Sequence, residues 1–477
     1  MTSLMTNFHK KAEQWFLPLL IVGLVAFINL KFAYSYQFFV GDDWDWLYTA
    51  QFSTVSQIFT ILPGAVYNDR PVGALAVKLI YTLFGLSSDA FYLFQLGVHI
   101  LNCLLLFWIA KKYIGAGGAA LAAVLAGTWV VANDAVFWTA AVFDLVGATA
   151  CLLSIFLWQL GVRQNRWVWI VLGALVYFLS IRTKEFAISL PIIILFISHL
   201  LEKQSLRASI TRLWPYWLVM GVMGVWYGVL MQKSAIVGNS DAYGLHFSGI
   251  LENLNYYLGT MFYENLWDPQ RRVWNALHGF MILAAAILWI LAIVRSAHYR
   301  KVLMVSVIGF LGLLGPTLLL KNHLGQLYLY APHFFLAMAI GALFPLGLMY
   351  RIAIPALGIA IVAFPLSSQW FHEKRDYYVS HTLQTREQFE LFQKHLPQIA
   401  PGAQVFIANL AQWNPFDYQG GKPLKVMKQN SSLQLHAHLQ DREAIMLFCK
   451  SSGPKIFIRM QGAQSIDETK SIRAQCP

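Results

Sequence analysis

The sequence predicts an all-α polytopic membrane protein with about eleven transmembrane helices, followed by a small α/β domain. Hydrophobic residues make up 57% of the 477 positions and charged residues 12%, and the mean hydropathy of +0.53 is far above that of soluble proteins. Apolar stretches of about 20 residues recur, which is the length that a helix needs to cross a bilayer. The composition turns polar near residue 371, so we assign a membrane domain to residues 1–370 and an α/β domain to residues 371–477.

The first apolar stretch, residues 15–37, lacks a small-residue cleavage site, so we expect a retained helix rather than a signal peptide. Residues 38–87 and 232–274 form two long connections whose amphipathic stretches favour helices on the membrane surface, as a lid or a wall of a site. The other predicted spans are residues 88–110, 116–133, 136–160, 167–182, 186–201, 213–231, 275–294, 302–320, 328–350 and 352–370.

Lys and Arg gather in alternate connections, which the positive-inside rule assigns to the cytoplasm. We therefore expect an inner-membrane protein with a cytoplasmic N-terminus and a C-terminal domain in the periplasm or another extracytoplasmic space. Most of the net charge of +12 lies in these cytoplasmic connections, where it sets topology and contacts anionic membrane lipid. Nucleic acid is excluded as a partner on this ground.

Acidic residues gather on the outer side, and the stretch FFVGDDWDWL at 38–47 carries three of them directly after the first span. Outer connections also carry Arg and Lys residues that an anionic ligand would explain. A carboxylate can take a proton from an attacking hydroxyl, and Arg or Lys can stabilise the charge on a departing phosphate. This combination suits the transfer of a group from a lipid phosphate.

A series of motifs over roughly residues 10–350 resembles the multispanning GT-C glycosyltransferases, namely bacterial protein mannosyltransferases, aminoarabinose transferases and tetratricopeptide-type O-mannosyltransferases. The motifs are the Asp pair, NDRPVGAL, HILNCLLLFWIAKKY, VFWTAAVFDLVGATACLLSIF, RTKEFAISLPIIIL and HLGQLYLYAPHFFLAMAIG. The resemblance implies an inverting enzyme that moves a sugar from a polyprenyl-phosphate donor, of undecaprenyl type in a bacterium, to a hydroxyl of a lipid, glycan or protein acceptor. The tetratricopeptide repeats of the animal relatives are missing here, so their acceptor is not carried over.

The resemblance places the catalytic base in the Asp pair, with Asp42 as our candidate and Asp43 as a helix cap or second ligand. Without the resemblance, either aspartate could simply cap the helix that follows. Arg70, which precedes Pro71, is implied to hold the lipid phosphate, and the planar guanidinium suits phosphate oxygens. The alternative is an exposed Arg that snorkels from a surface helix.

Lys184 and Glu185 are implied to line the central cavity, with Lys184 on phosphate or sugar, Glu185 orienting it and Arg182 nearby. An ordinary ion pair at a helix end is the alternative reading of the same residues. His323, near the last outer loop, is a candidate for donor contact, and Tyr328 and Tyr330 beside it could contact the sugar or the lipid. Such residues are more often interface anchors.

Asp144 is a candidate cavity acid, because an ionisable residue in an apolar span is functional by default. With Asp42 and Asp43 it could hold Mg²⁺ or Mn²⁺ through carboxylate oxygens. We favour catalysis without a metal and expect no required cofactor. His99 and Asn102 are interpreted as structural, hydrogen-bonding between helices.

Three other functions remain open at this stage. A non-catalytic carrier or flippase of lipid-linked sugars needs the phosphate-binding cations but no base. An ion-coupled transporter would use Asp144 and should show internal repeats, of which we find no convincing example. A signalling or adhesion protein would work through its C-terminal domain. No nucleotide-binding signature or zinc-ligand spacing is present in the sequence.

The C-terminal domain is predicted to hold a helix at TLQTREQFELFQKHL and strands at AQVFIANL, AIMLFCK and KIFIRM. Cys449 and Cys476 could pair in an oxidising compartment, or remain as thiols. Its role could be to bind the acceptor, to cap the site or to make an assembly contact.

Overall fold

The computed structural model describes residues 16–30, 38–59, 70–233, 247–263, 283, 286–294, 296–320, 323–344, 382–408, 420–439, 441–461 and 464–477. The chain divides into two compact units. Unit 1 comprises residues 1–33, 61–73 and 92–373, and unit 2 comprises residues 34–60, 74–91 and 374–477. Each unit is described by itself.

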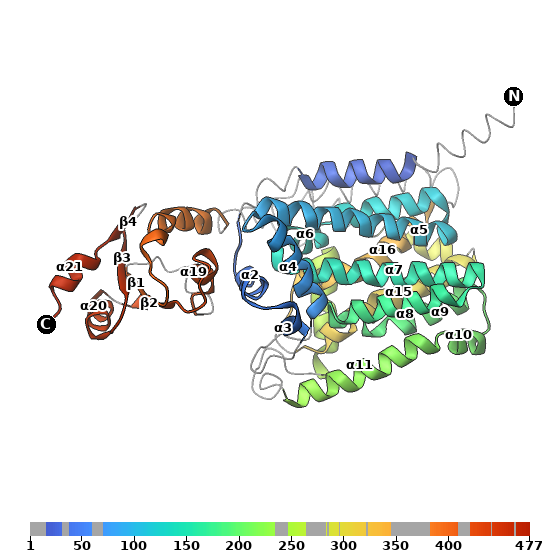
Figure 1. The fold of residues 1–477 in the computed structure, drawn as a ribbon. Coiled ribbons are helices and arrows are strands. Elements are labelled where there is room, and N and C mark those ends of the chain that lie inside the picture. The colour runs from blue at the N-terminus through green and yellow to red at the C-terminus, as the bar shows by residue number, and fades with distance from the viewer. Residues whose placement is uncertain are drawn as a thin grey trace, which may run out of the picture. The chain divides into compact units, whose positions relative to one another are not determined.

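Unit 1 is a bundle of apolar helices (Figure 1). Three helical stretches in the described part of the chain are long and apolar enough to cross a membrane: α5 (Ser88–Thr128), the stretch Thr139–Gln164 that contains α7 (Val142–Gln164), and α15 (Ala297–Leu318). Within α5, Gly115 has a non-helical φ of 72°, so two helices meet there, between the predicted spans 88–110 and 116–133. The expected number of eleven spans stays a prediction, and span 352–370 lies outside the described residues.

Shorter elements complete unit 1 and lead into unit 2. The helix Phe16–Leu30 comes first, and α4 (Pro71–Phe84) follows in the first long connection, with residues 71–73 in unit 1 and residues 74–84 in unit 2. The remaining elements are η1 (Val130–Ala132), α6 (Asn133–Phe137), η2 (Thr139–Ala141), α8 (Trp167–Ile181), η3 (Glu185–Ser189), α9 (Leu190–Phe196), η4 (Ile197–Leu201), α10 (Leu206–Arg212), α11 (Trp214–Lys233), η5 (Phe247–Gly249), α13 (Ile250–Leu258), η6 (Gly259–Tyr263), η9 (Gln326–Leu329) and α16 (Tyr330–Gly341).

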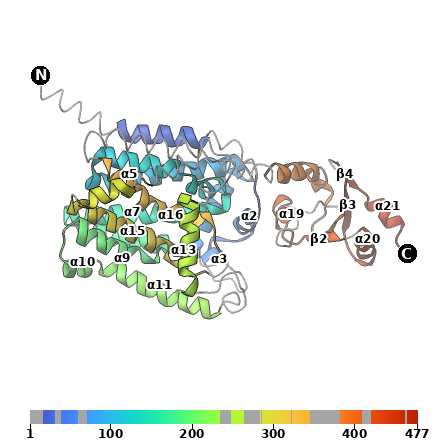
Figure 2. The same ribbon diagram turned by 180° about the vertical axis from the view of Figure 1, so that it is seen from behind.

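Helix α7 packs along α8, and α15 packs against α9 and α16. Figure 2 shows α7, α15 and α16 beside one another in the bundle. Polar side chains tie α5 to α16 inside this apolar packing. The Tyr330 hydroxyl lies 2.8 Å from Nδ1 of His99 and 3.0 Å from Nδ2 of Asn102, and all three side chains are fully buried. The prediction that His99 and Asn102 make hydrogen bonds between helices is confirmed.

Two glycines let α5 and α16 touch backbone to backbone. A Cβ atom on Gly118 would lie 2.5 Å from the carbonyl oxygen of Gly341, and one on Gly341 would lie 2.3 Å from that of Gly118. Real Cβ atoms essentially never come so close, and the obstacle is main chain that cannot rotate away. Small residues at a helix crossing serve the same purpose in membrane bundles generally.

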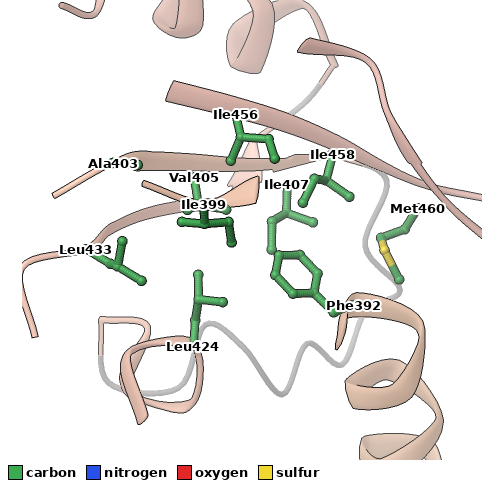
Figure 3. Close-up of a cluster of buried hydrophobic side chains, with 10 residues drawn as sticks. All are labelled: Phe392, Ile399, Ala403, Val405, Ile407, Leu424, Leu433, Ile456, Ile458 and Met460. Atoms are coloured by element: carbon green, nitrogen blue, oxygen red, sulfur yellow. The ribbon is translucent and has the colours of Figure 1, made fainter. Parts of the chain in front are cut away.

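The C-terminal part of unit 2 is a four-stranded sheet of order β2-β1-β3-β4. Strand β1 (Gln404–Ala408) pairs in parallel with β2 (Gln434–Leu439) and β3 (Lys455–Gln461), and β4 (Gln464–Asp467) runs antiparallel to β3. The buried residues of one core cluster lie between this sheet, α19 (Lys422–Met427) and the helix over residues 382–393 (Figure 3). Phe392, Leu424 and Ile458 meet in this cluster.

The prediction of a strand at AIMLFCK is wrong, because these residues lie in α20 (Asp441–Lys450). Ala444 and Phe448, four residues apart, face the core, while Asp441 and Glu443 in the first turn and Lys450 in the last complement the helix dipole. The predicted strands at AQVFIANL and KIFIRM correspond to β1 and β3, whereas β2 and β4 were not predicted. The first predicted helix is present over residues 382–393.

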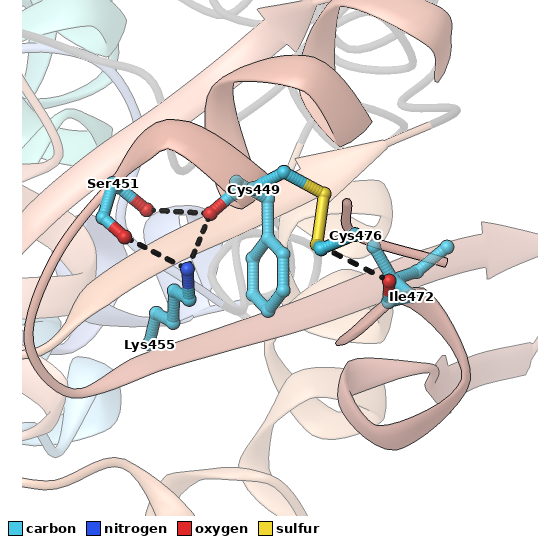
Figure 4. The surroundings of a disulfide bond; sticks show 6 residues. Cys449, Ser451, Lys455, Ile472 and Cys476 are labelled. Carbon is cyan, nitrogen blue, oxygen red and sulfur yellow. Dashed lines mark hydrogen bonds between the residues drawn. A yellow bond between two sulfur atoms is a disulfide. The ribbon is translucent and has the colours of Figure 1, made fainter. Parts of the chain in front are cut away.

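Cys449 and Cys476 form a disulfide that joins α20 to the residues after α21 (Thr469–Ala474) (Figure 4). Their Cα atoms are 5.3 Å apart. Nearby, the ammonium of Lys455 donates hydrogen bonds to the carbonyl oxygens of Phe448 and Ser451, at 2.6 and 2.8 Å, and so caps the C-terminal end of α20. Of the two arrangements considered for these cysteines, the paired one is observed.

Unit 2 also contains the chain just after the first apolar stretch, including α2 (Asp43–Phe52) and α3 (Val55–Phe59). Aromatic rings fix the start of α2: the Phe39 ring centre lies 5.7 Å from that of Trp44 and 5.3 Å from that of Phe91 at the start of α5. The ammonium of Lys78 on α4 donates to the carbonyl oxygens of Ala50 and Ser53, at 2.7 and 2.8 Å, which caps the other end of α2.

The glycine contact gives a stability prediction. Gly118→Ala should destabilise the detergent-solubilised protein by about 1–3 kcal/mol, because the methyl group overpacks a backbone contact. The thermal unfolding midpoint would measure this. Gly97→Ala, in the part of α5 before Gly115, is the control, since its Cβ would meet nothing within 4 Å. Equal midpoints for the two variants would show that the helices are not in contact at Gly118.

Candidate functional site

A bidentate ion pair joins two motifs that are 115 residues apart in unit 1. Nε of Arg70 lies 2.7 Å from Oε1 of Glu185, and Nη2 of Arg70 lies 2.8 Å from Oε2. This parallel geometry is the strongest that Arg and a carboxylate form. Partial burial disfavours the charged form of Arg70, but the Glu185 carboxylate outweighs that effect and holds the pKa of Arg70 above its ordinary value.

A second ion pair lies deeper in unit 1. Nζ of Lys184 is 2.5 Å from Oδ2 of Asp144, and the two side chains are only 7% and 3% exposed. The Arg70 and Glu185 side chains, by contrast, are 20% and 39% exposed. Sequence neighbours Lys184 and Glu185 therefore belong to two different pairs, one buried and one open to the surroundings.

Tyr328 completes the cluster from η9. Nζ of Lys184 lies 5.0 Å from the centre of its ring, a cation–π contact. The His323 ring is packed edge-on against Tyr328, with ring centres 5.8 Å apart. The structure thus brings together six of the predicted site residues, which are Arg70, Asp144, Lys184, Glu185, His323 and Tyr328.

Local backbone geometry explains why these side chains meet. Asp144 stands in the first turn of α7, where the helix dipole favours a carboxylate. Lys184 is in extended conformation between α8 and η3, so its side chain leaves the helix direction and reaches α7. The backbone N–H of Val72 donates to the carbonyl oxygen of Arg182 at 3.3 Å, which fixes the start of α4, and hence Arg70, beside this break.

Arg182 and Tyr330 are placed differently from the other candidates. The Arg182 guanidinium lies 5.9 Å from the centre of the Trp226 ring on α11. Tyr330, considered with Tyr328 for sugar or lipid contact, is fully buried and bound to His99 and Asn102. That expectation for Tyr330 is wrong, because its hydroxyl is used between helices.

The Asp pair lies in unit 2, at the beginning of α2. Asp43 is 2% exposed, and its Oδ2 accepts a hydrogen bond from the backbone N–H of Val40 at 2.9 Å. Asp42 is the N-cap residue of α2, is partly exposed, and makes no capping hydrogen bond to the helix through its side chain. Of the two aspartates, Asp43 therefore holds the local turn together.

The comparisons with known proteins bear on this cluster. A family model described as dolichyl-phosphate-mannose-protein mannosyltransferase matches residues 68–231. The crystal structure of ArnT from Cupriavidus metallidurans bound to undecaprenyl phosphate shares the fold, with a TM-score of 0.54, 13% identity and coverage of 92% of this chain and 93% of that one. The resemblance to GT-C glycosyltransferases is confirmed. ArnT from the same organism in the apo state matches with a TM-score of 0.53, 13% identity and coverage of 92% of each chain. No curated protein matches by sequence.

The segment that the family model matches contains both ion pairs and Arg182, whereas Asp42, Asp43, His323 and Tyr328 lie outside it. Within the described residues, no three His, Cys, Asp or Glu side chains are grouped as metal ligands would be. Asp144, a candidate ligand for Mg²⁺ or Mn²⁺, is bound to Lys184.

The buried pair can be tested through stability. Lys184→Met and Asp144→Leu should each destabilise the protein by about 3–5 kcal/mol, because each leaves a buried charge uncompensated. The double variant should recover most of this loss, as read from thermal midpoints in detergent. Arg386→Met, which breaks the exposed pair with Glu390 at 3.0 Å, should change the midpoint little. A double variant less stable than both single variants would contradict the pairing.

Proposed function

We propose that the protein transfers a sugar from a polyprenyl-phosphate donor to an acceptor hydroxyl at the outer face of the cytoplasmic membrane. The observation that carries the proposal is the double ion pair of Arg70, Glu185, Lys184 and Asp144, within the segment that resembles a mannosyltransferase family. The fold shared with ArnT, whose crystal structure is bound to undecaprenyl phosphate, supports a donor of that lipid class.

Arg70 and Lys184 have separate tasks in this proposal. Arg70 is the more exposed cation and receives the donor phosphate, while its Glu185 partner fixes the plane of the guanidinium. Lys184, held by Asp144 and by the Tyr328 ring, supplies a second positive charge in a less polar environment, where electrostatic stabilisation is stronger. The two carboxylates balance the two cations before a ligand binds.

Asp42 serves as the general base in this mechanism, a role implied by its position in the GT-C-like Asp pair. Asp43 is assigned the local structural role, because its carboxylate is buried against Val40. The acceptor oxygen attacks the anomeric carbon, the bond from that carbon to the phosphate oxygen breaks, and the acceptor proton passes to Asp42. Polyprenyl phosphate leaves from the face opposite the attack, so the anomeric configuration inverts.

The disulfide supports the proposed side of the membrane. Cys449–Cys476 is a bond of the kind that persists in oxidising compartments such as the periplasm. It therefore favours an extracytoplasmic location for the C-terminal residues of unit 2, in agreement with the positive-inside pattern of the sequence.

Replacing the proposed base gives the decisive activity test. Asp42→Asn should lower sugar transfer by about 10²–10⁴-fold, the usual effect of losing a general base, with donor binding retained. The assay would follow radiolabelled sugar from undecaprenyl-phosphate sugars into a membrane extract in nanodiscs. Asp89→Asn, at an exposed acid in the first turn of α5, is the matched control. Bound donor without turnover in the wild type, and equal binding by the variant, would favour the carrier function instead.

Donor binding should depend on the shape of Arg70 as well as on its charge. Arg70→Lys keeps the charge but cannot make the parallel pair with Glu185, so KM for the donor should rise about tenfold or more. A thermal midpoint equal to that of the wild type would exclude misfolding as the cause of the higher KM. A donor KM equal to that of the wild type would remove Arg70 from the phosphate site.

A further inference from the structure

The C-terminal domain reaches the helix that carries the Asp pair at its start, and both lie in unit 2. Nζ of Lys422 on α19 is 2.5 Å from Oδ1 of Asp45 on α2, and it also lies 5.7 Å from the centre of the Tyr48 ring. Asp45 and Tyr48 are three residues apart and so share one face of α2. Asp42 precedes Asp45 by the same interval, which places it one turn away on that side.

A second contact lies just before α2. The ring of Phe389, in the helix over residues 382–393, meets the ring of Phe38 edge-on, with centres 4.7 Å apart. Phe38 in turn lies 5.9 Å from Trp44, which is buried in the first turn of α2. An aromatic contact and an ion pair thus hold the two sides of the Asp pair.

Both contacts are made by elements rooted in the core of the C-terminal domain. Leu424, two residues after Lys422, and Phe392, three residues after Phe389, are fully buried in the cluster beneath the sheet (Figure 3). In addition, the Lys428 ammonium donates to the carbonyl oxygen of Leu396 at 2.6 Å, which links α19 to the end of the neighbouring helical segment. The C-terminal domain therefore contacts this part of the chain at two points, Phe38 just before α2 and Asp45 within it.

We propose that Lys422 is a positioning residue: through Asp45 it fixes the first turn of α2, and with it the carboxylate of Asp42. The effect of Lys422 on turnover rests on the proposed function. Its effect on the order of the first turn of α2 does not. The C-terminal domain then acts on the reaction through the base, independently of any acceptor that it binds.

The first test needs no substrate. Hydrogen exchange of the amides of residues 43–52 in the full chain should become about tenfold faster in Lys422→Glu, because the ion pair is replaced by repulsion. The charge-swapped variant Lys422→Glu/Asp45→Lys should restore the protection. Lys425→Glu, on the same helix, is the matched control and should leave exchange unchanged. Exchange unaltered in Lys422→Glu would overturn the proposal.

The second test separates positioning from general structural damage. Lys422→Glu should lower kcat about tenfold per molecule able to bind undecaprenyl phosphate, with the donor KM within about twofold of wild type. Lys422→Arg and the charge swap should both recover kcat. Faster exchange without a change in kcat would overturn the positioning role. If instead Asp42→Asn proves fully active, the proposed function fails. The hydrogen-exchange experiment would still test whether the contact between α19 and α2 orders α2.

Discussion

The need to pair every buried charge organises the helical unit. An isolated ion in an apolar bundle is costly, and Lys184 and Asp144 avoid this cost by meeting at 2.5 Å between α7 and the break after α8. The same break carries Glu185, which draws Arg70 from the start of α4 into the cluster. Three segments that are distant in sequence, the start of α4, the first turn of α7 and the break after α8, are therefore held together by charge complementarity, in a bundle that otherwise relies on close apolar packing.

The sequence predicts all four of these charged residues as parts of a site, but not which of them pair. The prediction rests on the type of side chain, on the side of the membrane assigned to it and on the family resemblance. It covers Arg70 before Pro71, the Lys184–Glu185 motif and Asp144. Pairing depends on where each backbone segment turns, and the extended conformation of Lys184 that separates it from Glu185 has no signal in the sequence. In the C-terminal domain, α20 was mistaken for a strand because AIMLFCK is a short apolar run, for which strand and helix patterns coincide. The flanking acids Asp441 and Glu443 were the better guide.

Unit 2 joins two parts of the chain that the sequence suggested were separate. The predicted boundary near residue 371 is based on composition. Composition gives no sign that Asp45 forms an ion pair with Lys422. No sequence pattern marks Lys422, which stands in an unremarkable GGKPLK segment. Only the fold reveals that Phe39 packs on Trp44 at the start of α2, that Lys78 caps its end and that Asp45 forms an ion pair with α19.

The contact between Gly118 and Gly341 has a consequence for lipid traffic. Because the main chains of α5 and α16 touch there, with no side chain between them, no hydrocarbon tail can pass between the two helices at that point. A long isoprenoid tail that approached this bundle sideways would have to enter at another level of this helix pair or between other helices. The two glycines thus close one point of lateral access for lipid.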